Sequence, residues 1–145
     1  MTKEEYLSQV GELTREIIYH TAKLSRMRRD MDVISTVRYD LFGKNGSVKR
    51  NAPFEYTIER IEEEERQLAE KQEMLAKLQG QVGDAINAIS NEKLRLVLLY
   101  KYLEGKSYMQ IGDLLFVDKA TAKRWQSRAM EELDIPEKPI RIKKS

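Results

Sequence analysis

A seven-residue repeat of apolar side chains restricts the first part of this chain to long helices. Over residues 2–41, one heptad position is held by Val10, Ile17, Leu24 and Met31. The second position is held by Tyr6, Leu13, Met27, Ile34 and Leu41. A repeat sustained over this length predicts one continuous helix that buries the stripe against a helical partner.

A second run of heptads supplies that partner within the same chain. One position in residues 54–89 is held by Phe54, Ile61, Leu68, Leu75, Val82 and Ile89. The intervening position is apolar only near the ends, and in the middle it carries Glu65, Gln72 and Gln79. Residues 42–53 contain turn-forming glycine and asparagine, and Pro53 suits the first turn of a helix. Matched lengths around this loop predict a long antiparallel helical hairpin, a coiled coil over residues 1–89.

Polar residues within the hairpin are predicted to be structural. His20 falls on the apolar stripe, where one polar side chain can fix the register. Residues 62–65 are four successive glutamates that point in different directions around a helix, which predicts a solvated face and no metal site. Because a narrow seam between two helices buries little apolar surface, we also predict a third partner. This is either a second copy of the chain or the C-terminal domain folded back, and we favour self-association through the N-terminal helices.

Composition excludes several classes of function. One histidine and no cysteine leave no zinc site, no disulfide and no nucleophile paired with a base. We therefore predict that the protein is not an enzyme and holds no cofactor or metal. No apolar run approaches the roughly 20 residues of a membrane span, and no secretion signal is visible, so a cytoplasmic protein is predicted.

Residues 90–134 predict a separate domain of three short helices. Ser90 is expected to cap a helix over residues 91–103, which Gly105 then ends in a left-handed conformation. Ser107 and Gln110 have the spacing of a capping box at the start of a second helix. Asp118 caps the third helix, whose inner face carries Ala122, Trp125, Ala129 and Leu133. Two capped helices separated by a tight turn predict a helix-turn-helix.

The third helix of this domain, residues 119–133, concentrates positive charge on its outer face. Residues 90–145 contain 12 basic and 8 acidic residues, a net charge of +4, whereas the whole chain carries only +2. The outward residues predicted to bind DNA are Lys119, Ala120, Thr121, Lys123, Arg124, Ser127 and Arg128. Arg124 is the predicted base reader, because a guanidinium can grip guanine with two bonds. Lys123 and Arg128 are predicted to hold phosphates.

A basic tail follows the domain. Residues 135–145 begin with Pro136 and Pro139 and end with Arg141, Lys143 and Lys144. The two prolines are expected to close the fold, and residues 140–145 are predicted to stay disordered and to add attraction for phosphate.

The spacing of several residues in the C-terminal domain matches a known module. A leucine- and valine-rich helix is followed by Tyr102-Leu103-Glu104-Gly105, Ser107-Tyr108, Ile111-Gly112, Val117, Thr121 and Arg128-Ala129. With these features, about 45 of the 145 residues resemble region four of bacterial sigma factors, which reads promoter DNA upstream. Phe116 stands where such turns usually have glycine, so strain is expected there. Ala122 replaces a larger aliphatic residue, which leaves space for Trp125.

The resemblance implies a sequence-specific DNA-binding transcription regulator. Its partners would be double-stranded DNA and, as a second candidate, RNA polymerase. A coiled coil before a C-terminal sigma-like module is also similar to small phage and prophage activators of late genes, which act in the bacterial cytoplasm. Two alternatives stay open: a phage small terminase subunit, which would form a large ring, and a structural coiled-coil protein that does not bind DNA.

Overall fold

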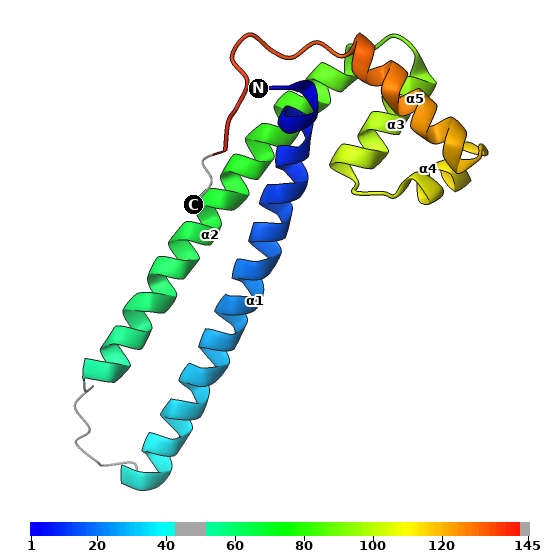
Figure 1. Cartoon of the computed structure of the whole chain (residues 1–145). Helices are drawn as coiled ribbons and strands as arrows, with labels where there is room; N and C mark the ends of the chain where they lie inside the picture. The colour runs from blue at the N-terminus through cyan, green and yellow to red at the C-terminus, as the bar shows by residue number, and fades with distance from the viewer. Residues whose placement is uncertain (43–51, 143–145) are drawn as a thin grey trace. The chain divides into compact units, whose positions relative to one another are not determined.

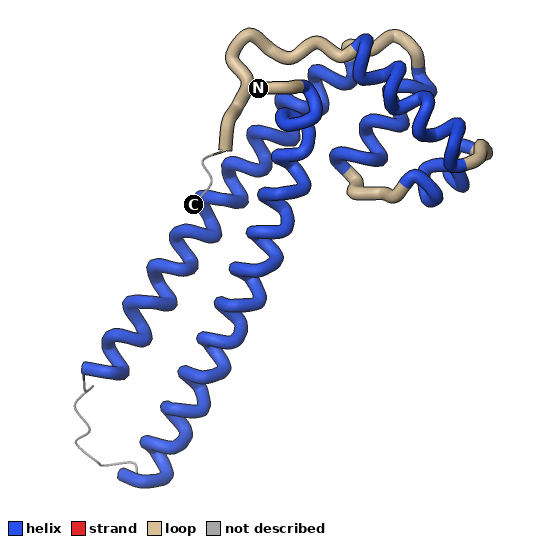
Figure 2. Tube along the Cα trace, viewed as in Figure 1, coloured by secondary structure: helices blue, strands red, loops and turns tan. Residues whose placement is uncertain are grey.

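The chain is helical throughout the part that the structure describes. The computed structural model describes residues 1–42 and 52–142, so most of the predicted loop and the last three residues lie outside it. The elements are α1 (Lys3–Phe42), α2 (Ala52–Asn87), α3 (Glu92–Leu98), the π-helix η1 (Leu99–Leu103), α4 (Tyr108–Leu115) and α5 (Lys119–Glu132). Figure 1 traces their order, and Figure 2 draws only helices and loops over the described residues. The predicted all-α fold class is confirmed.

The chain divides into two compact units, and each is considered by itself. One unit, which we call the core unit, consists of Met1–Thr14 and Met74–Ser145. The other, the hairpin unit, consists of Arg15–Glu73. The unit that contains the helix-turn-helix therefore also includes the first turns of α1 and the last turns of α2.

In the hairpin unit α1 and α2 run antiparallel, as the heptads predict (Figure 1). Leu24 and Leu68 are buried at the seam. Lys71 Nζ lies 3.1 Å from Glu16 Oε2, and Arg28 Nη2 lies 2.9 Å from Glu65 Oε1. The residue numbers on α1 rise while those on α2 fall, so the two stripes pair within one chain.

A histidine–glutamate pair interrupts this seam. His20 Nδ1 contacts Glu64 Oε1, and Lys23 Nζ lies 3.4 Å from the other oxygen of the same carboxylate. His20 is a half-buried polar member of the seam, as expected. The prediction of a solvated Glu64 is wrong, because this side chain is only 7% exposed. Burial raises its pKa, but hydrogen bonds from His20 and Lys23 outweigh burial, and the net pKa lies below its ordinary value.

The apolar interior of the core unit joins the first turns of α1 and the last turns of α2 to the C-terminal helices. Its buried members include Tyr6, Leu7, Val10, Leu78, Val82, Ile86, Leu94, Leu98, Ala129 and Leu133. Leu7 and Leu78 lie off the predicted heptad stripes, yet both are fully buried. The stripe widens here because α1 and α2 pack against α3 and α5 as well as against each other.

The connection from α2 into α3 differs from its prediction in two details. Asn91, not Ser90, is the N-cap, and its side-chain oxygen accepts from the backbone nitrogens of Lys93 at 3.0 Å and Leu94 at 3.3 Å. The predicted α-helix over residues 91–103 finishes as η1, where Glu104 N donates to Leu99 O at 3.1 Å. Gly105 adopts φ 66°, so its predicted left-handed conformation is confirmed.

The C-terminal segment is hydrogen-bonded to the core unit at residues 138–142, so the predicted disorder is wrong for residues 140–142, and the rest of the predicted tail lies outside the described residues. Gln9 Nε2 donates to Ile140 O at 2.9 Å, and Gln9 Oε1 accepts from Ile142 N at 2.8 Å. Gln81 Oε1 accepts from Ile140 N at 2.9 Å, and Gln81 Nε2 donates to Lys138 O at 3.0 Å. The side chains of these two glutamines therefore pair with backbone groups of residues 138–142. Ile140 and Ile142 pack on the apolar core.

Candidate nucleic-acid interface

The first helix of the helix-turn-helix begins with the predicted capping box. Ser107 Oγ accepts from Gln110 N at 3.2 Å, and Gln110 Oε1 accepts from Ser107 N at 2.9 Å. Two backbone donors that a helix start leaves unpaired are thereby satisfied. The position of α4 is fixed further by Ile111, which is buried against Val97 and Ala122.

The turn between α4 and α5 depends on a close backbone contact. Val117 N donates to Gly112 O at 2.9 Å, and a Cβ at Gly112 would lie 2.6 Å from the carbonyl oxygen of Val117. A side chain at position 112 would therefore push the turn away from α4. Phe116 takes φ 59° and ψ 42°, the left-handed conformation that its place in the turn predicted. Its ring makes no compensating contact, because the residue is 94% exposed.

Asp118 starts α5 as predicted. Its Oδ1 accepts from Thr121 N at 2.7 Å. Hydrogen bonds from the side chain and then the backbone of Thr121 hold the pKa of Asp118 below its ordinary value. The cap is consequently ionised at neutral pH, which suits the positive end of the helix dipole.

The inner face of α5 anchors the helix in the core unit. Ala122, Ala129 and Leu133 are fully buried, although Leu133 lies one residue beyond the last helical residue, Glu132. Trp125 is half-buried and packs against both apolar clusters of the unit, so it lies on the predicted inner face but at the border of the core. Lys93 Nζ lies 5.4 Å from the centre of the Trp125 ring and covers it.

The outer face of α5 brings the predicted DNA-binding residues onto one surface. Six of the seven are exposed: Lys119, Ala120, Lys123, Arg124, Ser127 and Arg128. Thr121 is half-buried at the edge of that surface, and its Oγ1 accepts from Arg124 Nη2 at 2.9 Å. The guanidinium of Arg124 is thus held by a residue one turn earlier on the same helix. Ser127 Oγ donates to Lys123 O at 3.3 Å.

Sequence reasoning missed two residues next to this surface. Lys101 of η1 and Tyr108 of α4 lie beside Lys123, with Lys101 Nζ 4.3 Å and Lys123 Nζ 5.5 Å from the centre of the Tyr108 ring. No periodicity links residues that belong to three different elements. The Ser107-Tyr108 pair was noted only as part of a family pattern.

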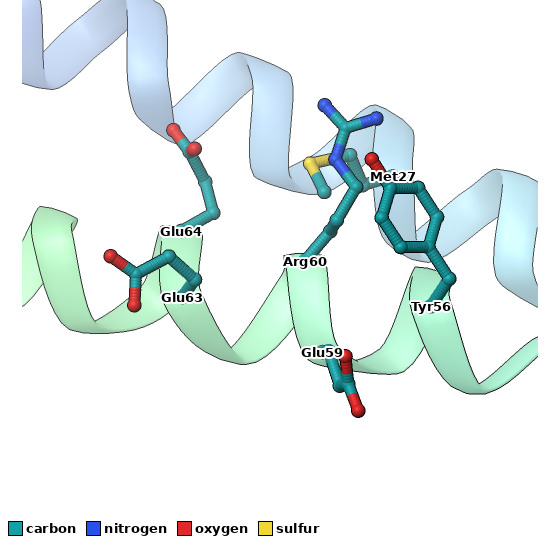
Figure 3. A pocket seen from close by; sticks show the side chains of 6 residues that line it. All are labelled: Met27, Tyr56, Glu59, Arg60, Glu63 and Glu64. Carbon is teal, nitrogen blue, oxygen red and sulfur yellow. The ribbon is translucent and has the colours of Figure 1, made fainter.

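A hollow in the hairpin unit is a competing candidate site (Figure 3). It measures about 210 Å³ and is lined by Met27, Tyr56, Glu59, Arg60, Glu63 and Glu64. Figure 3 shows Arg60 beside the Tyr56 ring, and the guanidinium carbon lies 5.7 Å from the ring centre. Among the residues that the structure places, no group of three His, Cys, Asp or Glu side chains is arranged to hold a metal ion. We assign no ligand to this hollow.

The sequence of the C-terminal domain matches a known family. Residues 90–134 match the family model of a homeodomain-like domain. No curated protein and no solved structure matches the chain. Across residues 1–42 and 52–142, no helix is long and apolar enough to span a membrane. The match and the geometry together support a DNA-binding helix-turn-helix within residues 90–134.

Proposed function

We propose that the protein is a sequence-specific transcription regulator that reads the major groove of duplex DNA with α5. The outer face of α5 carries this proposal. Lys119, Lys123, Arg124 and Arg128 lie on it, and residues 119–128 contain no acid. None of these four cations forms an ion pair within the described residues, so each is available to a phosphate or a base edge.

Two of these cations are proposed to have different roles. Arg124 reads a base, because Thr121 already orients its guanidinium at the exposed face. Arg128 holds a phosphate. Arg124→Ala should relax sequence preference and leave non-specific binding nearly intact, since a good bidentate pair discriminates by about 1–3 kcal/mol. Arg128→Ala should weaken binding to all sequences alike and lower the salt slope by about one unit.

A gel-shift titration at several salt concentrations, with DNA selected from random sequence, tests both roles. Arg60→Ala is the matched control, because it removes one exposed cation from the hairpin unit. Salt-insensitive binding by the parent chain, or parental behaviour by both α5 variants, would contradict the proposal. Absence of DNA binding would favour the structural coiled-coil alternative.

The finer role that we propose is activation of late genes by a phage or prophage protein in the cytoplasm of its bacterial host. RNA polymerase is the second proposed partner. Retention of core polymerase by the full-length chain on an affinity matrix tests this partner, and replacement of Arg141, Lys143 and Lys144 by glutamine checks for attraction by the basic tail alone. A phage small terminase subunit remains the alternative, and a ring of eight or more chains would favour it.

Self-association through the N-terminal helices is also proposed. The heptad seam is already filled within one chain, so a second copy must use an outer surface. Tyr19 and Val33 are exposed and two heptads apart on α1, and exposed Ile18 adjoins Tyr19. Analytical ultracentrifugation should give a smaller mass for Tyr19→Glu than for the parent. An unchanged mass for this variant and for Ile18→Glu would exclude this surface.

A further inference from the structure

Three side chains from different elements meet beside the outer face of α5. They are Lys101 of η1, Tyr108 of α4 and Lys123 of α5. Lys101 Nζ lies 4.3 Å and Lys123 Nζ 5.5 Å from the centre of the Tyr108 ring. Both distances fall within the range of about 6 Å over which a cation is attracted to an aromatic face. A single ring therefore gathers two positive charges that are far apart in the sequence.

These two cations have no carboxylate partner among the described residues. Neither Lys101 nor Lys123 forms an ion pair, whereas Lys23, Arg28 and Lys71 of the hairpin unit all do. Two ammonium groups around one ring repel each other, and the attraction of the ring offsets only part of this repulsion. An anion bound beside the Tyr108 ring would offset this repulsion without breaking an existing ion pair.

Tyr108 adds a hydrogen-bond donor to the two charges. Burial, followed by the charge of Glu4, raises the pKa of Tyr108, so its hydroxyl keeps the proton at neutral pH. Tyr108 is also the first residue of α4, whose N-terminal end carries a partial positive charge. Glu4, on α1 of the same unit, is the negative charge that raises this pKa, and it would repel an anion at this site.

We infer that Lys101, Tyr108 and Lys123 form one phosphate site that holds the backbone of duplex DNA beside the groove occupied by α5. The inference rests on the proposed function, because Lys123 belongs to the outer face of α5. It extends the interface from one helix to three elements. A phosphodiester fits this site because its single charge and its acceptor oxygens match ammonium and hydroxyl donors.

Lys101→Gln tests the site in the full-length chain, with Lys93→Gln as the matched control. Lys93 also covers an aromatic ring, but that ring is Trp125 on the inner face of α5. Lys101→Gln should weaken specific and non-specific binding by the same factor. It should also reduce the slope of log affinity against log salt by about 0.9. Between 50 and 200 mM salt, the variant should therefore lose about 3.5-fold less affinity than the parent chain loses. Lys101→Arg should restore the slope, and Lys93→Gln should keep it.

Uncharged methylphosphonates, introduced one at a time along the selected DNA, locate the contact. At one position the substitution should weaken the parent chain but leave Lys101→Gln unaffected. Three results would each overturn the inference. Lys101→Gln keeps the parental salt slope, Lys93→Gln changes the slope by the same amount, or every methylphosphonate weakens Lys101→Gln as much as it weakens the parent chain. If Lys101→Gln does not fold by circular dichroism, Lys101→Met replaces it, since methionine retains an apolar side chain of similar length. Failure of the parent and Arg128→Ala to behave as proposed would instead count against the function itself.

Discussion

Lys3 Nζ donates to the backbone carbonyl of Met130 at 2.9 Å, so the first residue of α1 binds the last turn of α5. The same nitrogen lies 3.4 Å from Glu131 O. A cation at the C-terminal end of a helix satisfies unpaired carbonyls and opposes the negative end of the dipole. The start of the chain thereby supports the helix proposed to read DNA.

Loss of this cation should lower the stability of the core unit. Lys3→Met keeps most of the aliphatic stem and removes the charge, at an expected cost of about 0.3–1 kcal/mol. Thermal unfolding followed by circular dichroism should show a fall of a few degrees in Tm. Lys138→Met is the control, because Lys138 contributes only its backbone carbonyl to a hydrogen bond. Equal Tm values for the parent and Lys3→Met would show that the contact contributes nothing measurable.

Most of the elements were predictable where one local rule decides the structure, although at the start of α3 two adjacent capping residues were available and the predicted one, Ser90, is not the cap. The capping box of Ser107, the cap of Asp118 and the left-handed Gly105 each follow from residues within one turn of the chain. The heptads likewise predict the seam at Leu24 and Leu68. The outer face of α5 follows from its inner apolar positions, because the two faces are complementary on a helix.

The contacts that join distant segments could not be predicted from local pattern. Leu7 and Leu78 are buried because α1 and α2 meet further helices, and heptad periodicity describes only one neighbour. Glu64 was misassigned because four adjacent glutamates look alike in sequence, and only the facing His20 distinguishes one of them. The tail was predicted to be disordered from its charge, but its order comes from Gln9 and Gln81, more than fifty residues away.

The glutamine contacts with the C-terminal segment predict a second effect on stability. Gln81→Leu would leave the hydroxyl of Tyr6 and two backbone groups of the segment without their partner. A buried polar group left without a partner costs about 1–3 kcal/mol, and water reduces this cost here because two of the bonds are part-buried and one is exposed. Trypsin should then cleave after Arg141 faster than in the parent, as mass spectrometry would detect. Gln79→Leu alters an exposed residue of the same helix and should leave the rate unchanged. Similar cleavage rates for both variants would mean that the glutamine does not hold the segment.

Acid should weaken the hairpin unit through Glu64. Its pKa is lowered in the folded chain, so its contribution to stability is present above the ordinary value of 4.5. That contribution is lost as the pH falls from about 4.5 through the lowered folded pKa. Thermal melting between pH 6 and pH 3 should therefore show a smaller decline for Glu64→Gln than for the parent. Parallel declines in the two proteins would assign the acid sensitivity to other carboxylates.

Phe116 is the residue at which a substitution should stabilise the chain. A non-glycine residue in the left-handed region costs about 1–2 kcal/mol, and Phe116, being 94% exposed, gains little packing in return. Phe116→Gly relieves this strain, although the greater freedom of glycine in the unfolded chain offsets about 0.5–1 kcal/mol. The net gain should be up to about 1 kcal/mol, measured as a higher Tm. Leu114→Gly, two residues earlier within α4, should instead destabilise by about 1 kcal/mol because its backbone is helical.

Phe116→Gly also separates the effect of backbone strain from an effect on DNA binding at the turn. The proposed interface excludes Phe116, so Phe116→Gly should bind the selected DNA with parental affinity in the gel-shift titration. A lower Tm for Phe116→Gly would contradict the strain argument, since the glycine would then have removed a stabilising contact. A higher Tm combined with weaker DNA binding would place the Phe116 ring in the interface and explain why a strained aromatic residue occupies the turn.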